Sequence, residues 1–117
     1  MPTDRTIDYI EFPAADLERA KRFYADAFGW KFEDYGPEYC AFTDGRLDGG
    51  FFRSELRAST GDGSALVVLY AADLEELSTR IVEHGGKIVR ATFPFPGGRR
   101  FHFTDPNGNE LAVWSDR

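Results

Sequence analysis

A helix signature that occurs twice, 57 residues apart (73 minus 16), constrains this 117-residue chain more than any other feature. The stretches "DLERAKRFYADAFGW" and "DLEELSTRIVEHGGK" begin at Asp16 and Asp73. In both, the aspartate precedes apolar residues at helical spacing, and a glycine, Gly29 or Gly86, follows at the same offset. Aspartate caps the free amides of a first helical turn, and glycine ends a helix. The pattern predicts an internal duplication with one helix in each copy.

Short strand patterns flank each helix, one before it and three after it. They are "TIDYIEF", then "WKFEDY", "EYCAF" and "GGFFR" in the first half, and "ALVVLY", then "KIVRA", "RRFHFT" and "ELAVW" in the second. This order predicts an α+β fold in which two βαβββ modules form a cupped mixed sheet with the helices on its outer face. We expect a single domain, 1–117, with module one at about 5–54, a polar connector at about 55–63 and module two at about 64–115.

Strand alternation indicates which side chains look away from the helices. The purely apolar face of each strand should meet a helix, which leaves Tyr9, Glu11, Glu110 and Trp114 on the concave side. His102 lies on another predicted strand and is a candidate for the same side. The two carboxylates are equally compatible with simple exposure to solvent.

The charge balance argues against polyanionic partners. The formal net charge is −6, and the cationic residues form no continuous stripe along the sequence, so we expect neither nucleic acid nor a membrane as a partner. No apolar run approaches the roughly 20 residues of a membrane span, which favours a cytoplasmic location. The single cysteine, Cys40, is expected to be a buried strand residue rather than a nucleophile.

Three stretches together resemble the vicinal oxygen chelate superfamily, which includes glyoxalases, bleomycin resistance proteins and extradiol dioxygenases. They are "YIEFPAADLERAKRFYADAFGWKFE", "AADLEEL" with "GGKIV", and "FTDPNGNELAVW". The chain is similar to small single-domain members. The resemblance implies paired βαβββ modules and a homodimer.

Metal-using members place His, His and Glu on the inner sheet face. The corresponding positions here are Tyr9, Leu66 and Ala112, and leucine and alanine cannot bind a metal ion. We therefore expect no cofactor. A rebuilt divalent metal site, with His102, Glu11 and Glu110 as ligands, remains the alternative.

The resulting prediction is a protein that binds a small apolar or planar molecule in a metal-free cleft. Tyr9 and Trp114 would offer stacking faces, and Glu11 or Glu110 would meet a donor or cation of the ligand. One alternative is a metal-dependent lyase, isomerase or dioxygenase that uses His102. Another is a dimeric structural or regulatory partner without a ligand. The sequence assigns no catalytic residue.

The segment "TFPFPGGRR", residues 92–100, raises a separate question. Its prolines, glycines and two phenylalanines fit a lid over the cleft, with Arg99 or Arg100 meeting an anionic group. They also fit a rigid loop that packs Phe93 and Phe95 onto the sheet.

Overall fold

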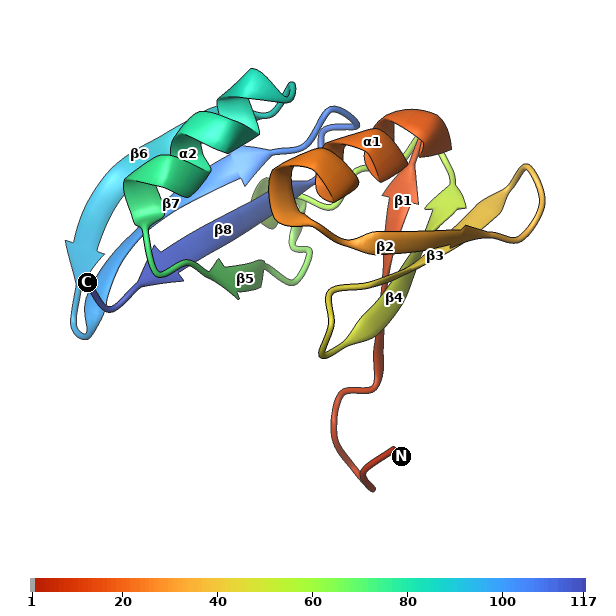
Figure 1. The fold of residues 1–117 in the computed structure, drawn as a ribbon, viewed down its shortest axis with the longest axis horizontal. Coiled ribbons are helices and arrows are strands. Elements are labelled where there is room, and N and C mark those ends of the chain that lie inside the picture. Colours follow the sequence, from red (N-terminus) through yellow and green to blue (C-terminus); the bar gives the residue numbers. More distant parts are fainter. Residues whose placement is uncertain (1) are drawn as a thin grey trace.

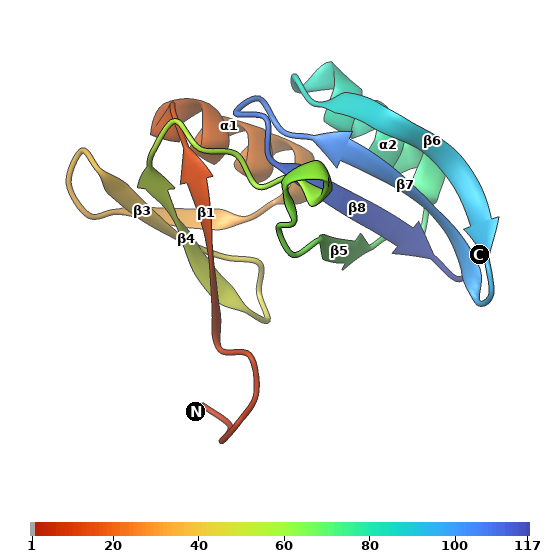
Figure 2. The ribbon, with the colours of Figure 1, turned by 180° about the vertical axis from the view of Figure 1, so that it is seen from behind.

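The computed structural model describes residues 2–117 and contains the two expected modules (Figures 1 and 2). Module one consists of β1 (Tyr9–Ala14), α1 (Leu17–Phe28), β2 (Lys31–Asp34), β3 (Tyr39–Thr43) and β4 (Asp48–Arg53). Module two consists of β5 (Val67–Tyr70), α2 (Leu74–Glu83), β6 (Lys87–Phe95), β7 (Gly98–Thr104) and β8 (Glu110–Ser115). A single 3₁₀ turn, η1 (Thr60–Asp62), lies in the connector.

Each module forms its own four-stranded mixed sheet, with strand orders β1-β4-β3-β2 and β5-β8-β7-β6. The first strand of each module pairs in parallel with the last, and the remaining pairs are antiparallel. The α+β fold is therefore confirmed, with two sheets in place of one. Both helices cover the same side of the two sheets and leave the other side open (Figures 1 and 2).

The repeated aspartates cap the two helices. The Asp16 carboxylate accepts a hydrogen bond from the amide of Arg19 at 3.0 Å, and Asp73 accepts one from Glu76 at 3.1 Å. α1 ends at Gly29, whose φ of +77° is accessible to glycine at little cost. The duplicated signature thus encodes helix boundaries as the sequence indicates.

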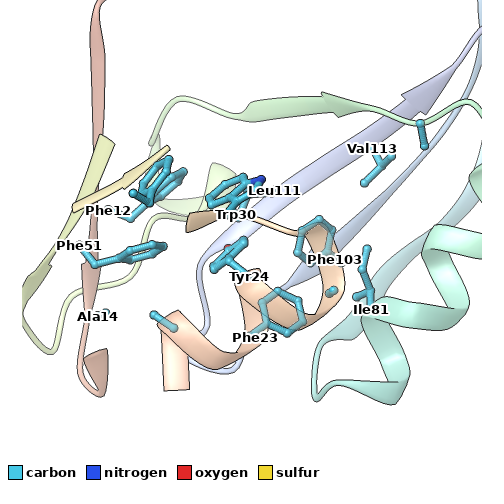
Figure 3. Close-up of a cluster of buried hydrophobic side chains, with 14 of the residues drawn as sticks. Phe12, Ala14, Phe23, Tyr24, Trp30, Phe51, Ile81, Phe103, Leu111 and Val113 are labelled. Carbon is cyan, nitrogen blue, oxygen red and sulfur yellow. The ribbon is translucent and has the colours of Figure 1, made fainter. Parts of the chain in front are cut away.

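One aromatic core runs through both modules (Figure 3). Tyr24 stacks on Trp30 at a centroid distance of 4.6 Å within module one. Phe23 and Phe28 of the same helix reach Phe103 of module two, at centroid distances of 6.1 and 5.8 Å. Because α1 packs against residues of both sheets, the halves share their buried apolar surface. Cys40 is buried in this core, as expected.

The turn between β7 and β8 joins the modules through asparagine side chains. Asn107 accepts from the Asp16 amide at 2.9 Å and donates to the Asp16 carbonyl at 3.0 Å. Asn109 donates to the Pro13 carbonyl at 2.7 Å and accepts from the Ala58 amide at 2.8 Å. The "DPNGN" stretch is therefore more than a chain reversal, since it satisfies backbone groups of module one.

Asp105, in the same turn, is buried beneath α1. Its carboxylate accepts from the Tyr24 hydroxyl at 2.8 Å and from the amides of Asn107 and Asn109. Burial raises the pKa of Asp105 above its ordinary value, although these donors counteract the effect. Burial also raises the pKa of Tyr24, so this residue stays a phenol and a donor.

The structure of residues 92–100 contradicts the predicted lid. β6 continues to Phe95 and β7 starts at Gly98, with Phe93 opposite Arg100 in register, so the segment is a tight hairpin. Ladder hydrogen bonds hold this backbone, which leaves no loop to act as a lid. The phenylalanines pack onto the open face of the sheet, as the competing interpretation held: Phe93 lies 5.9 Å from the His102 ring, and Phe95 lies 6.2 Å from Trp114.

Candidate functional site

Three side chains meet on the open face of module one: Tyr9, Glu11 and Tyr39. We call them the module-one cluster. Alternation along β1 turns Tyr9 and Glu11 away from the helices, as the sequence indicates. The Tyr39 hydroxyl donates to Glu11 at 2.9 Å and lies 2.5 Å from the Tyr9 hydroxyl. Because Tyr39 uses its proton for Glu11, Tyr9 donates to Tyr39, and the hydrogen bonds form a directed chain.

Gly50 makes this arrangement possible. It lies between Glu11 and Ala41 in the sheet register, and the Tyr39 ring extends over it. A Cβ atom at position 50 would be only 1.9 Å from the Tyr39 hydroxyl oxygen and 2.3 Å from Cζ. Burial, together with the bonds to Tyr9 and Glu11, raises the pKa of Tyr39, which keeps it protonated at neutral pH.

A hollow of about 600 Å³ opens beside this cluster, and we call it the module-one pocket. Its volume lies within the range of small-molecule sites, roughly 300 to 1,000 Å³. Aromatic side chains dominate its lining, and charged groups surround them. The lining residues are Tyr9, Lys31, Phe32, Glu33, Tyr35, Tyr39, Ala41, Phe42, Thr43 and Asp48.

A second polar group, the module-two cluster of His102, Glu110 and Thr60, lies on the other open face. His102 Nδ1 is 2.9 Å from Glu110 Oε2, and Oε1 of Glu110 accepts from the Thr60 amide and hydroxyl at 2.9 and 2.8 Å. These donors, His102 first, lower the pKa of Glu110. A carboxylate there favours the His102 tautomer that is protonated on Nδ1, which leaves a lone pair on Nε2.

His102 Nε2 is buried and has no hydrogen-bond partner within residues 2–117. His102 as a residue is only 6% exposed, and its ring lies beside the Phe93 ring. The Arg90 guanidinium also lies over the Phe93 ring, with Cζ 3.8 Å from its centroid. A buried imidazole oriented by a carboxylate can accept a proton at Nε2.

Trp114 lies further along the same open face. It is half-buried and contacts Tyr70 edge-on at 5.2 Å, with Phe95 on its other side. Arg100 is opposite Trp114 in the sheet register, and its guanidinium lies 5.9 Å from the Phe95 ring. Arg99 points to the helix side and pairs with Glu75 at 2.6 Å, so of these two neighbouring arginines Arg100 is the one that faces the open side.

The structure therefore groups the predicted residues by module. In module one, Tyr39 links Tyr9 to Glu11 through hydrogen bonds. In module two, His102 contacts Glu110, and Trp114 lies on the same sheet as these two residues. No hydrogen bond or ion pair links the two clusters across the described part of the chain. Their role in ligand binding stays a prediction.

Sequence reasoning missed Tyr39 and Thr60. Alternation in β3 puts Cys40 and Phe42 into the core and Tyr39 on the opposite face, so the same signal that identified Tyr9 was available for Tyr39. Thr60 comes from the connector, 50 residues before Glu110, and no local pattern indicates that contact.

The positions that hold a metal ion in related proteins do not fit one here. Leu66 and Ala112 have no donor atom, and the Tyr9 hydroxyl is engaged with Tyr39. Among residues 2–117, no three His, Cys, Asp or Glu side chains gather closely enough to hold an ion. The rebuilt set of His102, Glu11 and Glu110 does not assemble within the chain, because Glu11 lies on the other sheet.

The chain belongs to the glyoxalase/bleomycin resistance protein/dioxygenase superfamily, whose family model matches residues 6–113. Among curated proteins, it is 23% identical to the putative glyoxylase CFP32 of Mycobacterium bovis over 93% of its own length and 45% of that protein. The chain thus spans about half the length of this relative.

Solved structures share the fold. A glyoxalase/bleomycin resistance protein/dioxygenase family enzyme from Burkholderia phytofirmans superposes with a TM-score of 0.80 at 15% identity, covering 94% of this chain and 98% of that one. The fosfomycin resistance protein FosX from Mesorhizobium loti gives 0.77 at 18% identity, covering 97% and 93%. Neither helix within residues 2–117 has the length and apolar character needed to cross a membrane.

Proposed function

We propose that the module-one pocket binds a small planar molecule, preferentially a cationic one, without a metal ion. The observation that carries this proposal is the aromatic lining of the hollow, in which three tyrosines stand beside carboxylates. Glu33 and Asp48 line the pocket and Lys31 is its one cationic residue, so the lining is acidic on balance. Aromatic faces attract planar groups by stacking and cations through their quadrupole.

The module-one cluster prepares the pocket for such a ligand. The hydrogen bonds from Tyr9 to Tyr39 and from Tyr39 to Glu11 hold two aromatic rings in place before a ligand arrives. Preorganised side chains lose less rotational freedom on binding, which favours affinity. Tyr9 is 43% exposed, so its ring is available for contact.

Calorimetric titration with N-methylquinolinium, a planar cation, and with neutral quinoline tests the proposal. We expect saturable binding of the cation and weaker binding of quinoline. Tyr9→Ala should weaken the cation's binding by about fivefold, because one stacking face is lost. The matched control is Val82→Ala, which truncates an exposed apolar side chain on α2, outside the module-one pocket and on the helix side.

Treatment with EDTA should leave the affinity unchanged. Equal losses of affinity for Tyr9→Ala and Val82→Ala, or a loss of affinity on chelation, would contradict the proposal.

We also infer a homodimer that joins the open face of module one to the open face of module two of a second copy. The supporting observation is opposite charge on balance: Glu11, Glu33 and Asp48 outnumber Lys31 on the first face. On the second face, Arg90 and Arg100 outnumber Glu110. Light scattering on the eluting protein should give twice the chain mass of 13.2 kDa. Arg100→Glu should shift the protein toward monomer, whereas a monomeric parent protein would contradict the inference.

The module-two cluster supports a second candidate function, metal-free proton transfer by His102. Nε2 carries the free lone pair, and Phe93 shields it. Phe93→Ala should therefore speed the modification of His102 by diethyl pyrocarbonate, measured by mass spectrometry against the exposed His84 in the same sample. An unchanged rate at His102 would show that Phe93 is not the barrier to this atom.

A further inference from the structure

A second hollow, of about 660 Å³, lies on the helix side of the molecule. We call it the basic hollow. It opens between the first half of α1, the end of α2 and the turn that follows β7. Its lining residues are Arg19, Arg22, Phe23, Arg57, His84, Gly85, Lys87, Val89, Thr104, Asp105, Pro106, Asn107 and Gly108. None of them lines the module-one pocket.

Four cationic side chains converge on this hollow: Arg19, Arg22, Arg57 and Lys87. Arg19 and Arg22 are neighbours on α1, whereas Arg57 and Lys87 come from the connector and from β6, and the fold brings these three segments together. Three of them, Arg22, Arg57 and Lys87, have no ion-pair partner within residues 2–117, and Arg19 has only a 4.0 Å contact with Asp16. The concentration is notable in a chain whose net charge is −6.

Asp105 is the single carboxylate in the lining, and it is turned inward. It is only 4% exposed, and the Tyr24 hydroxyl and two backbone amides occupy its oxygens. It is therefore not available as a counterion at the mouth of the hollow. Free carbonyl groups at the end of α2 would repel an anion. The carbonyls of Val82 and Ile81, however, accept hydrogen bonds from the amides of Gly85 and Gly86.

Gly108 positions one of the cations. Its φ is +88°, and a Cβ atom there would lie 2.8 Å from Cδ and 2.9 Å from Nε of Arg57. The Arg57 side chain thus lies directly over the turn because residue 108 has no side chain. This packing holds the guanidinium beside the hollow, although Arg57 comes from the connector.

We propose that the basic hollow binds a small molecule that carries a phosphate group. Guanidinium groups pair with phosphate oxygens in a bidentate manner, and several such groups around a concave surface focus a positive potential. The volume suits a ligand of metabolite size. This site is separate from the open sheet faces and stands independently of the function proposed there.

Isothermal titration calorimetry with sodium pyrophosphate, at an ionic strength matched with sodium chloride, tests this site. Glycerol 3-phosphate and inorganic phosphate serve as further probes, to distinguish a phosphate ester from the free ion. We expect saturable one-to-one binding, weakened at least about tenfold in the double variant Arg22→Gln with Arg57→Gln, because charge-assisted hydrogen bonds are lost.

Arg46→Gln provides the matched control. Arg46 is exposed in the β3–β4 turn, has no ion-pair partner among the described residues, and lies outside the basic hollow. Its loss changes the net charge by one unit, as each test substitution does, and should leave the affinity within about twofold once salt screens long-range effects. Circular dichroism and urea unfolding establish that each variant is folded.

The proposal fails if millimolar pyrophosphate produces no saturable binding to the folded protein. It also fails if the loss of affinity per positive charge removed is the same for Arg46→Gln as for the double variant. That result would indicate non-specific electrostatic attraction of the anion to the whole protein. Binding of an oligoglutamate peptide without binding of any phosphate probe would overturn it too, and would identify a surface for an acidic protein segment.

Discussion

Replacing Gly50 with alanine should break the module-one cluster without straining the backbone. The added Cβ would lie 1.9 Å from the Tyr39 hydroxyl oxygen, a separation that real atoms do not adopt. Gly50 does not have a positive φ, so alanine is compatible with the strand itself. The Tyr39 ring is partly exposed and can rotate toward solvent, which limits the cost to the interactions that it abandons.

Those interactions set the magnitude. Tyr39 would lose its bonds to Tyr9 and Glu11, at about 1 kcal/mol each for groups at a surface. Replacing glycine with alanine returns about 0.4 to 1 kcal/mol by restricting the unfolded chain. We therefore expect Gly50→Ala to lower the free energy of unfolding by about 1 kcal/mol. In a Tyr39→Ala background, the same substitution should raise it by about 0.5 kcal/mol.

Urea unfolding, followed by circular dichroism, measures all four proteins of this double-mutant cycle. With a slope of about 1 to 3 kcal/mol per molar urea, a change of 1 kcal/mol moves the midpoint by roughly 0.3 to 1 M. The change of sign between backgrounds is the decisive readout. If Gly50→Ala destabilises both backgrounds equally, glycine is required at position 50 for the backbone conformation or for packing against a residue other than Tyr39. The argument about Tyr39 is then wrong.

Two further predictions concern buried or shielded carboxylates. Tyr24→Phe leaves Asp105 without its side-chain hydroxyl donor and should lower the free energy of unfolding by about 1 to 3 kcal/mol. Tyr70→Phe, which removes an exposed hydroxyl, should cost less than about 0.5 kcal/mol, and equal costs would contradict the assignment. Glu110 has a lowered pKa because His102 donates to it, so the stability that it contributes is present above its ordinary value of 4.5 and is lost as the pH falls below that value. Unfolding measured between about pH 5 and pH 3 should therefore show a steeper loss for the parent protein than for Glu110→Gln, and parallel curves would refute this prediction.

The fold was readable because its signals are local. Asp16 and Asp73 cap helices within three residues of themselves, and alternation in β1 and β8 distinguishes the core face from the open face over five or six residues. The sequence predicts a loop at residues 92–100, where the structure has a hairpin, because prolines and glycines usually indicate loops. Here Pro94 lies in an edge strand, where a missing amide costs no ladder bond.

The site was less readable because its contacts are distant in sequence. Glu11 and Tyr39 are 28 residues apart, and Thr60 and Glu110 are 50 apart. Alternation indicated that Glu11 and Glu110 face away from the helices, but it cannot say which partner each finds. The basic hollow shows the same limit, since Arg22, Arg57 and Lys87 belong to three separate segments. Their convergence follows from tertiary packing alone.

Asn107 and Asn109 fasten the last turn of the chain to the backbone of its first strand and helix, and Phe103 lies against the same helix. Neither repeat is therefore a self-sufficient folding unit. A gene fragment that encodes either half should yield an aggregation-prone product, and the two halves should melt in one transition. The two modules are therefore alike in their topology but depend on each other for their stability.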